Sequence, residues 1–149
     1  MKTYYDWEDI ETSVKDIYGQ IKRIEWVPDV IIGIANGGSI PATLFSKLSN
    51  IPCKIVTVQL RDGAIQETLD MDDIHTKYGK NILIVDEIND TGETLHWILH
   101  NWHLSTSDIR IATLTYNKAS VIASDFYYWK IDKRLDPVWI VYPWESFVD

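Results

Sequence analysis

Short runs of apolar, mostly β-branched residues alternate with segments of helical periodicity, and this alternation constrains the fold more than any other feature of the sequence. The runs occupy residues 30–34, 55–58, 82–85, 109–114 and 138–142. Such runs are typical of strands buried on both faces of a parallel sheet.

The segments between the runs predict helices. Residues 7–24 carry apolar side chains at helical spacing, and Asp6 stands where an N-cap is expected. The apolar positions are Ile10, Val14, Ile17, Ile21 and Ile24. Residues 39–48 and 93–102 show a similar stripe. Alternating strands and helices predict one three-layer α/β domain over residues 1–149, a parallel sheet flanked by helices, with ligands at the carboxyl ends of the strands.

Charge and composition exclude several classes of function. The net charge is −8, so a general DNA- or RNA-coating role is not expected. No apolar run is long enough to cross a bilayer, and a signal-peptide pattern is absent. The single cysteine, Cys53, cannot form an internal disulfide and is expected to be a buried apolar residue. We therefore expect a cytoplasmic protein that does not bind membranes.

Residues 60–80 form a long polar connection between the second and third predicted strands. Connections of this length are often mobile lids over active sites, and a surface excursion without a role is the alternative. Arg61 opens this segment.

The third predicted strand runs directly into a cluster of acids and hydroxyls. Asp86 and Glu87 end the strand, Asp90 follows, and Thr-Gly-x-Thr at residues 91–94 opens a helix. Free backbone N–H groups at the start of a helix bind phosphate, whereas carboxylates bind sugar hydroxyls or hydrated Mg²⁺. The combination predicts a site for a phosphorylated sugar with a metal ion.

Residues 82–95 resemble the phosphoribosyl-diphosphate (PRPP) signature of type I phosphoribosyltransferases. The resemblance implies that Asp86 and Glu87 contact the ribose hydroxyls and Mg²⁺, and that Asp90 lies near N7 of a purine and acts as general base or acid. The residues implied to bind the 5′-phosphate are Asp90, Thr91, Gly92, Glu93 and Thr94.

Residues 31–42 resemble the pyrophosphate loop of the same family, a glycine turn between a strand and a helix. The implied contacts are Asn36, Gly37 and Gly38, because glycines let backbone amides approach an anion closely. Members often hold a cis non-proline peptide here, which we expect at the Asn36–Gly37 bond. Many members carry Arg or Lys where this chain has Asn36. Arg61 is a further candidate for the pyrophosphate, and a surface arginine is the alternative.

The C-terminal segment, residues 116–149, resembles the base-recognition segment of small microbial xanthine-guanine and hypoxanthine phosphoribosyltransferases. Lys118 falls where a lysine of those enzymes meets the 6-oxo group of the purine. Trp139 and Ile140 fall where a stacking ring and a backbone carbonyl are supplied.

The resemblance implies transfer of the phosphoribosyl group from PRPP to N9 of a 6-oxopurine, with Mg²⁺ as cofactor and with a purine nucleotide and pyrophosphate as products. It also implies a homodimer or homotetramer, and the surplus of Trp and Tyr fits an aromatic interface. A non-catalytic sensor of PRPP or a nucleotide is the rival, favoured by Asn36. A pyrimidine or orotate enzyme is a third possibility, disfavoured by the C-terminal segment.

Three histidines share one flank of the predicted helix 93–102 and its end. His96, His100 and His103 recur at a spacing that resembles a set of metal ligands, but no fourth ligand is evident in the sequence. A solvated flank is the preferred interpretation.

Overall fold

The structure is a computed structural model that describes residues 1–61, 64–66 and 69–146, with only the backbone described for residues 59–61 and 64–66. Its main sheet has five parallel strands in the order β3-β2-β6-β7-β8. The strands are β2 (Val30–Ala35), β3 (Cys53–Thr57), β6 (Asn81–Asn89), β7 (Asp108–Asn117) and β8 (Phe126–Ile131). Because β2 and β6 are neighbours in the sheet, the loops at their carboxyl ends lie on the same edge.

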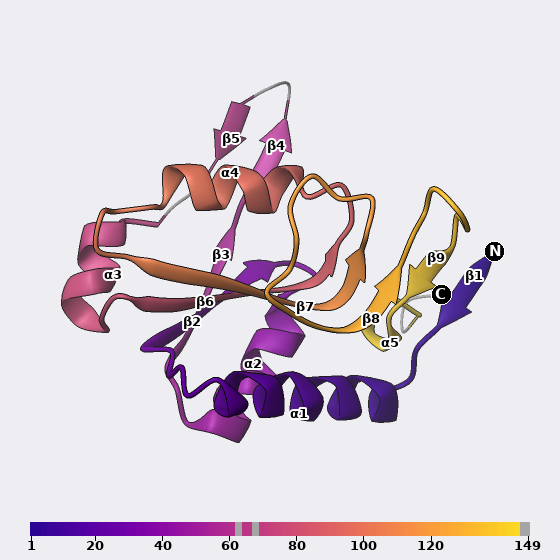
Figure 1. The fold of residues 1–149 in the computed structure, drawn as a ribbon, viewed down its shortest axis with the longest axis horizontal. Coiled ribbons are helices and arrows are strands. Elements are labelled where there is room, and N and C mark those ends of the chain that lie inside the picture. Colours follow the sequence, from indigo (N-terminus) through magenta and orange to yellow (C-terminus); the bar gives the residue numbers. More distant parts are fainter. Residues whose placement is uncertain (62–63, 67–68, 147–149) are drawn as a thin grey trace.

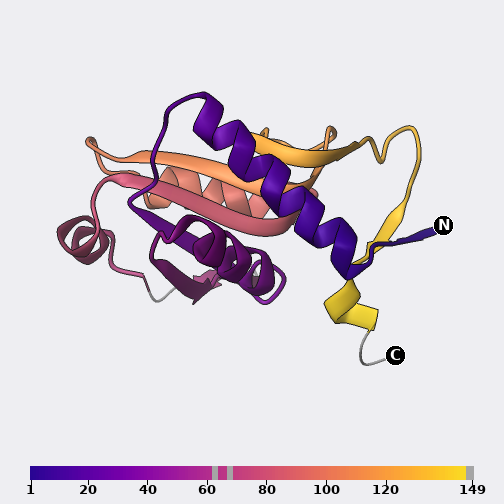
Figure 2. The same ribbon diagram turned by 90° about the horizontal axis from the view of Figure 1, so that it is seen from below.

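Helices cover both faces of this sheet, so the prediction of a three-layer α/β fold is confirmed (Figures 1 and 2). The helices α1 (Trp7–Arg23) and α2 (Ser39–Ser49) lie on one face, and α3 (Met71–Lys77) and α4 (Glu93–Asn101) lie on the other. Each pair encloses its own cluster of buried apolar side chains against the sheet.

The first helix forms as its sequence predicts. The Asp6 carboxylate accepts a hydrogen bond from the Asp9 N–H, and the Asp9 carboxylate accepts one from the Asp6 N–H, so both acids cap the helix start. The expected apolar stripe is buried as far as Ile21. Ile24 lies beyond the last helical residue and is 52% exposed, so its predicted place in the stripe is wrong.

The fifth strand of the main sheet is not the one expected. Residues 138–142 contain β9 (Trp139–Val141), which pairs with β1 (Lys2–Tyr4) in a separate two-stranded sheet. The place at the edge of the main sheet is taken by β8. This strand alternates buried and more exposed residues, as an edge strand does, and therefore lacks the continuous apolar run by which the other strands were predicted.

The long connection 60–80 contains regular structure. Strands β4 (Gln59–Arg61) and β5 (Ala64–Gln66) pair as a hairpin, and α3 follows. Met71 and Ile74 of α3 are buried in the cluster beneath α4, so this helix is packed against the body of the protein. The lid hypothesis therefore concerns only the part before Leu69. Among the helices that the structure describes, none is long and apolar enough to span a membrane.

Candidate active site

Two adjacent carboxylates stand at the carboxyl end of β6. The Asp86 carboxylate accepts a hydrogen bond from the Glu87 N–H at 2.8 Å. Burial, followed by repulsion from Glu87, raises the pKa of Asp86 well above its usual range. Burial also raises the pKa of Glu87, and the nearby Glu145 carboxylate adds to this effect. Negative charge is concentrated here without a cation to balance it among the described residues that contact the pair.

The two carboxylates fit a magnesium ion. Glu87 Oε2 is buried and has no hydrogen-bond partner among the described residues. Unpaired buried carboxylate oxygens are costly, and oxygen ligands of this kind are those that Mg²⁺ prefers. A bound cation would both satisfy Glu87 Oε2 and relieve the repulsion between Asp86 and Glu87.

The loop after β6 leads into α4 through a left-handed glycine. Gly92 has φ +83°, and a Cβ there would overlap Ser120 Oγ, so only glycine fits this position. The first amides of α4 have no acceptor within the helix, and Gly92 supplies no side-chain cap. A cavity of about 120 Å³ lies over this loop. It is lined by Asp86, Ile88, Asn89, Asp90, Thr91, Gly92, Glu93, Thr94 and Leu95. The structure therefore brings together all the residues predicted for the 5′-phosphate.

The Asn89 side chain connects this loop to the segment that follows β7. This side chain is fully buried, donates to the Ile122 carbonyl oxygen at 2.8 Å and accepts from the Ser120 hydroxyl at 2.6 Å. The Val121 N–H donates to the Thr91 carbonyl oxygen at 2.9 Å. The segment after β7 thus forms a wall for the phosphate loop.

The glycine turn after β2 faces the carboxylates. Gly37 packs so closely on Glu87 that a Cβ would overlap Glu87 Oε2, and a Cβ on Gly38 would overlap the Val85 carbonyl oxygen. The loop does contain a cis non-proline peptide, but it is the Ala35–Asn36 bond and not the expected Asn36–Gly37 bond. The cis bond joins Ala35, the last residue of β2, to Asn36. Arg61 closes β4, and its side chain lies outside the described residues.

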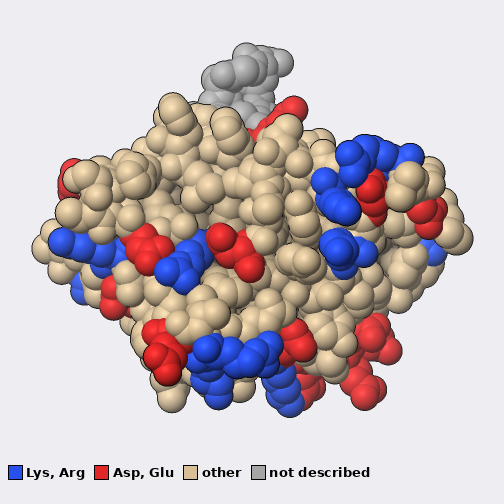
Figure 3. Space-filling view, viewed as in Figure 1, with Lys and Arg blue, Asp and Glu red and all other residues tan. Residues whose placement is uncertain are grey.

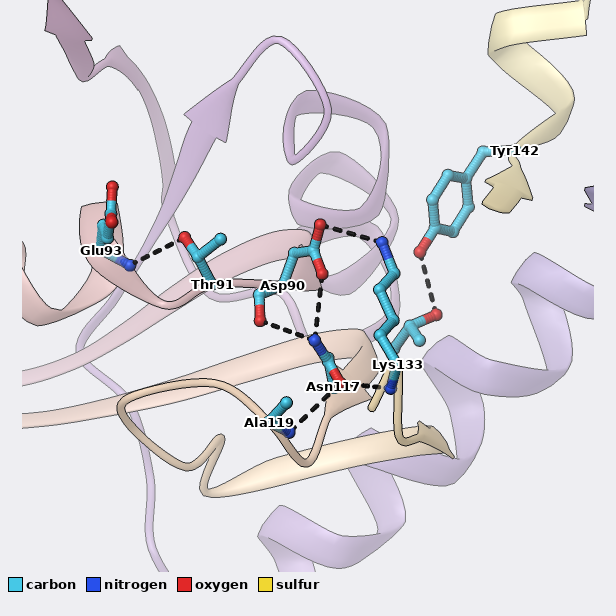
Figure 4. Close-up of polar contacts among 8 residues, drawn as sticks. Asp90, Thr91, Glu93, Asn117, Ala119, Lys133 and Tyr142 are labelled. Carbon is cyan, nitrogen blue, oxygen red and sulfur yellow. Dashed lines mark hydrogen bonds and ion pairs between the residues drawn. The ribbon is translucent and has the colours of Figure 1, made fainter. Parts of the chain in front are cut away.

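Asp90 belongs to a polar network that spans three loops (Figure 4). The Lys133 ammonium lies 3.0 Å from Asp90 Oδ2. The Asn117 side-chain amide donates to Asp90 Oδ1 at 3.1 Å and to the Asp90 carbonyl oxygen at 3.0 Å. Asn117 Oδ1 in turn accepts from the backbone N–H groups of Ala119 and Lys133. Asn117 therefore joins the carboxyl end of β7 to both neighbouring loops.

A second cavity, of about 170 Å³, adjoins the phosphate cavity and shares Ile88 and Asp90 with it. Its lining residues are Glu87, Ile88, Asp90, Lys133, Trp139, Ile140, Tyr142 and Glu145. Of the three residues predicted to bind the purine, it contains Trp139 and Ile140. The Trp139 side chain is 60% exposed and Ile140 is buried.

Lys118 does not line this cavity as the structure describes it. Lys118 is exposed, and its N–H donates to the Ile131 carbonyl oxygen at 2.7 Å. Arg134 is the main cause of the lowered pKa of Asp132, about 2, and the Lys118 ammonium contributes to this shift. The charge of Lys118 is therefore close to Asp132.

The segment that carries Trp139, residues 139–142, is attached to the N-terminal strand. Strand β9 pairs in parallel with β1, with Lys2 opposite Trp139, and the Trp139 N–H donates to the Met1 carbonyl oxygen at 2.8 Å. The Tyr142 hydroxyl lies 3.1 Å from the Glu87 carbonyl oxygen and 2.9 Å from Thr115 Oγ1. The contact with Glu87 ties the Trp139 segment to β6, which carries the carboxylates, and the contact with Thr115 ties it to β7.

Basic side chains gather near the segment that carries Trp139, although the chain is acidic overall. Figure 3 shows a group of Lys and Arg side chains, with some acids among them, over the loop between β8 and β9. Such a local group of cations offers an anionic ligand a favourable approach.

Sequence reasoning missed Asn89, Asn117 and Lys133. Asn89 and Asn117 each end a strand at the edge where ligands are expected, which is a signal that was available. Lys133 lies in a run of charged residues after β8 and carries no such signal.

The other candidates lie apart from the site. His96, His100 and His103 are exposed, with the rings of His96 and His100 stacked 6.5 Å apart. No group of three or more potential metal ligands of the His, Cys, Asp or Glu type is present in the part of the chain that the structure describes. Cys53 is half-buried on β3, and this burial raises the pKa of its thiol.

Comparisons with known proteins agree with this geometry. Residues 1–146 match the model of the phosphoribosyl transferase domain family. The chain is 32% identical over 124 residues to the hypoxanthine-guanine phosphoribosyltransferase of Schizosaccharomyces pombe, and the match covers 66% of this chain and 58% of the relative. The chain thus spans less than two thirds of the length of that relative.

Two solved structures cover nearly the whole chain. The purine phosphoribosyltransferase from Pyrococcus horikoshii Ot3 is 30% identical, with a TM-score of 0.77 over 97% of this chain and 94% of that one. A hypothetical protein from Neisseria gonorrhoeae with bound ppGpp is 27% identical, with a TM-score of 0.77 over 97% and 89%. The match over residues 1–146, together with the loops described above, shows that this chain belongs to the phosphoribosyl transferase domain family.

Proposed function

We propose that the protein transfers the 5-phosphoribosyl group of PRPP to N9 of a 6-oxopurine (hypoxanthine, guanine or xanthine), releasing pyrophosphate, in a purine salvage reaction. The observation that carries the proposal is the pair of adjoining cavities that share Asp90. One is lined by the start of a helix and the other by an exposed tryptophan, and the carboxylates of Asp86 and Glu87 lie where they meet. A phosphorylated sugar joined to a planar base has this arrangement of groups.

The sugar and its phosphates are assigned to the loops after β6 and β2. The 5′-phosphate is held by the amides and hydroxyls of residues 90–94, and the ribose hydroxyls by Asp86 and Glu87. The pyrophosphate is held by Asn36, Gly37 and Gly38, with Arg61 as a further contact. Mg²⁺, when held by Asp86 and Glu87, supplies positive charge that stabilises the departing pyrophosphate.

Asp90 is assigned the proton transfer. As the bond between N9 and C1′ forms, the bond between C1′ and the pyrophosphate oxygen breaks, and that oxygen keeps the electron pair. The proton lost by the purine passes to the Asp90 carboxylate. A carboxylate has about four lone-pair sites, so the contacts of Asp90 with Lys133 and Asn117 leave room for this proton. The transition state is expected to be oxocarbenium-like, as in other glycosyl transfers.

Base binding is assigned to Trp139, Ile140 and Lys118. Trp139 offers an exposed side chain for stacking, and Ile140, which lines the same cavity, is assigned the backbone carbonyl. Lys118 is the donor that the sequence predicts for the 6-oxo group. It belongs to the same loop as Ala119, which is tied to the network through Asn117.

Assembly and location complete the proposal. A homodimer or homotetramer is supported by an apolar hollow between α1 and α2, lined in part by Trp7, Val14, Leu44 and Leu48, and light scattering of the purified protein tests it. A cytoplasmic location is supported by the single cysteine, since it forms no internal disulfide.

A panel of bases tests the function. Hypoxanthine, guanine, xanthine, adenine, uracil and orotate are each supplied with PRPP and Mg²⁺, and pyrophosphate release is followed. The proposal expects turnover with 6-oxopurines and a value of kcat/KM for adenine lower by roughly 10³-fold. Binding of PRPP without turnover on any base would establish the rival, a non-catalytic sensor. Turnover on orotate or uracil alone would establish a pyrimidine enzyme.

A further inference from the structure

Two histidines lie one turn apart on the exposed side of α4. Leu95 and Ile98 of this helix are buried in the cluster against the sheet, whereas His96 and His100 are exposed. Side chains four residues apart on a helix are neighbours on its surface. The centres of the two imidazole rings accordingly lie 6.5 Å apart, and the ring planes are 11° from parallel. The helix therefore presents both rings side by side to the solvent.

The ring nitrogens of this pair are available to a ligand. Neither ring forms a hydrogen bond or an ion pair with another residue of the described ranges. A neutral imidazole carries one nitrogen with a free lone pair, and exposed side chains change rotamer rapidly. Zinc–nitrogen bonds are about 2.0–2.1 Å long, so a small rotation of both rings brings one nitrogen of each onto a single ion.

The surroundings of the two rings favour a cation. A hollow over this side of α4 is lined by Glu93, His96, Trp97, His100, Asn101 and Val121. Among these lining residues, all of them in the described part of the chain, there is a carboxylate and no lysine or arginine. Imidazole is a preferred ligand of Zn²⁺, Ni²⁺ and Cu²⁺, whereas Mg²⁺ prefers oxygen ligands. Paired histidines at this helical spacing are also a recurring way of holding zinc.

The other histidines do not complete the set. The helix ends at Asn101, so His103 does not continue the helical spacing of His96 and His100. His75 Nε2 lies 2.9 Å from Ser107 Oγ and is engaged there. No group of three or more such ligands occurs within the ranges that the structure describes. Water would therefore fill the remaining coordination positions, and the ion would be exchangeable.

We propose that His96 and His100 bind one divalent transition-metal ion of the kind that prefers imidazole (Zn²⁺, Ni²⁺ or Cu²⁺). This site is separate from the proposed magnesium site, because its donors are ring nitrogens and not the carboxylates of Asp86 and Glu87. The inference goes beyond the proposed function and does not depend on it. Since the ion joins two successive turns of α4, it stabilises the folded helix over the unfolded chain.

The test uses the full chain without an affinity tag. His96→Gln, His100→Gln and the double variant remove the proposed ligands, and glutamine is chosen because it is a good helix former. His103→Gln is the matched control, since it removes an exposed histidine just beyond the helix. Each protein is titrated with Zn²⁺ and with Ni²⁺ by calorimetry in excess Mg²⁺, which occupies carboxylate sites without competing for imidazole. Thermal unfolding without transition metal shows that each variant is folded.

We expect the wild type and His103→Gln to bind one ion per chain with the same affinity. Each single substitution in the pair should weaken binding by about 10- to 100-fold, because the second ligand of a chelate binds intramolecularly. Ni²⁺ should raise the Tm of the wild type and leave that of the double variant unchanged. Binding should also weaken in acidic buffer, because only the neutral imidazole binds a metal.

The inference is overturned if the wild type binds neither ion, or if the double variant binds as tightly as the wild type. A loss of affinity in His103→Gln as large as that in His100→Gln would overturn the assignment of the two ligands. If a glutamine variant does not fold, the alanine variant at the same position replaces it and is judged by the same affinities. Turnover on the panel of bases is scored separately, so a failure of the proposed function leaves this result unaffected.

Discussion

Gly37, in the loop after β2, packs directly on the carboxylate of Glu87 at the end of β6, and the contact leaves no space for a side chain at position 37. Because the carboxylate is buried and Glu87 Oε2 has no partner among the described residues, anything that moves this carboxylate changes the proposed metal site.

Gly37→Ala is therefore expected to impair binding of PRPP with Mg²⁺ more than it impairs folding. The new methyl group displaces a side-chain end, so the loss of stability should stay within the ~1–3 kcal/mol typical of overpacking. The affinity for PRPP should fall by about tenfold or more, as measured by calorimetry. Gly19→Ala is the control, since a Cβ there meets only Arg23 at an ordinary 3.5 Å, and it should stabilise α1 without changing PRPP binding. Normal PRPP affinity in Gly37→Ala would remove this loop from the site.

Magnesium and PRPP together should stabilise the protein against heat. At a PRPP concentration of about 100 times its dissociation constant, linkage gives about 2.7 kcal/mol, or roughly 5–10 °C in Tm. Chelation of Mg²⁺ should remove most of this shift. Glu87→Gln should also remove it, while the Tm of the ligand-free variant stays level or rises, because burial raises the pKa of Glu87 and charging this group costs stability at neutral pH. If Mg²⁺ and PRPP raised the Tm of Glu87→Gln as much as that of the wild type, Glu87 would be excluded as a metal ligand.

Asp90→Asn tests the general base. The substitution preserves the shape of the loop and removes the ability to accept the proton, so kcat should fall by about 10²-fold or more with little change in PRPP affinity. Asp132→Asn is the control, because it removes a carboxylate that pairs with Arg134 at 2.8 Å and does not line the cavity. Wild-type turnover in Asp90→Asn would exclude Asp90 from proton transfer and leave the phosphate loop unaffected.

Trp139→Ala separates a binding role from a packing role. The side chain is 60% exposed, so its removal should change the free energy of unfolding by only about 0.5 kcal/mol. The affinity for every purine nucleotide should nevertheless fall alike, by roughly 10-fold, since a stacked base is worth about 1–3 kcal/mol. Trp7→Ala, at a site that is 54% exposed on α1, should leave nucleotide affinity unchanged. The prediction fails if Trp139→Ala unfolds the protein or binds nucleotides normally.

The sequence predicted those parts of the structure that depend on local pattern. Strands β2 and β6 are continuous apolar runs, and the helix after each strand starts where its glycine turn ends, so both loops of the site were found together with their carboxylates and glycines.

Features that depend on contacts between distant residues were not predictable in this way. Lys133 and Asp90 are 43 residues apart in sequence, and hydrogen bonds of Asn117 join their loops. Strand β9 was expected in the main sheet because its composition does not reveal that β1 is its partner. The cis bond lies at Ala35–Asn36, one bond before the expected position, and the local sequence pattern does not distinguish the two bonds.

The central claim is tested most directly by phosphorus-31 NMR of one sample that contains the protein, PRPP, Mg²⁺ and hypoxanthine. The account predicts that the PRPP signals disappear while those of IMP and free pyrophosphate grow in a 1:1 ratio, and that Asp90→Asn slows both signals equally. Unchanged PRPP signals in a sample where calorimetry shows PRPP to be bound, with guanine and xanthine giving the same result, would contradict it.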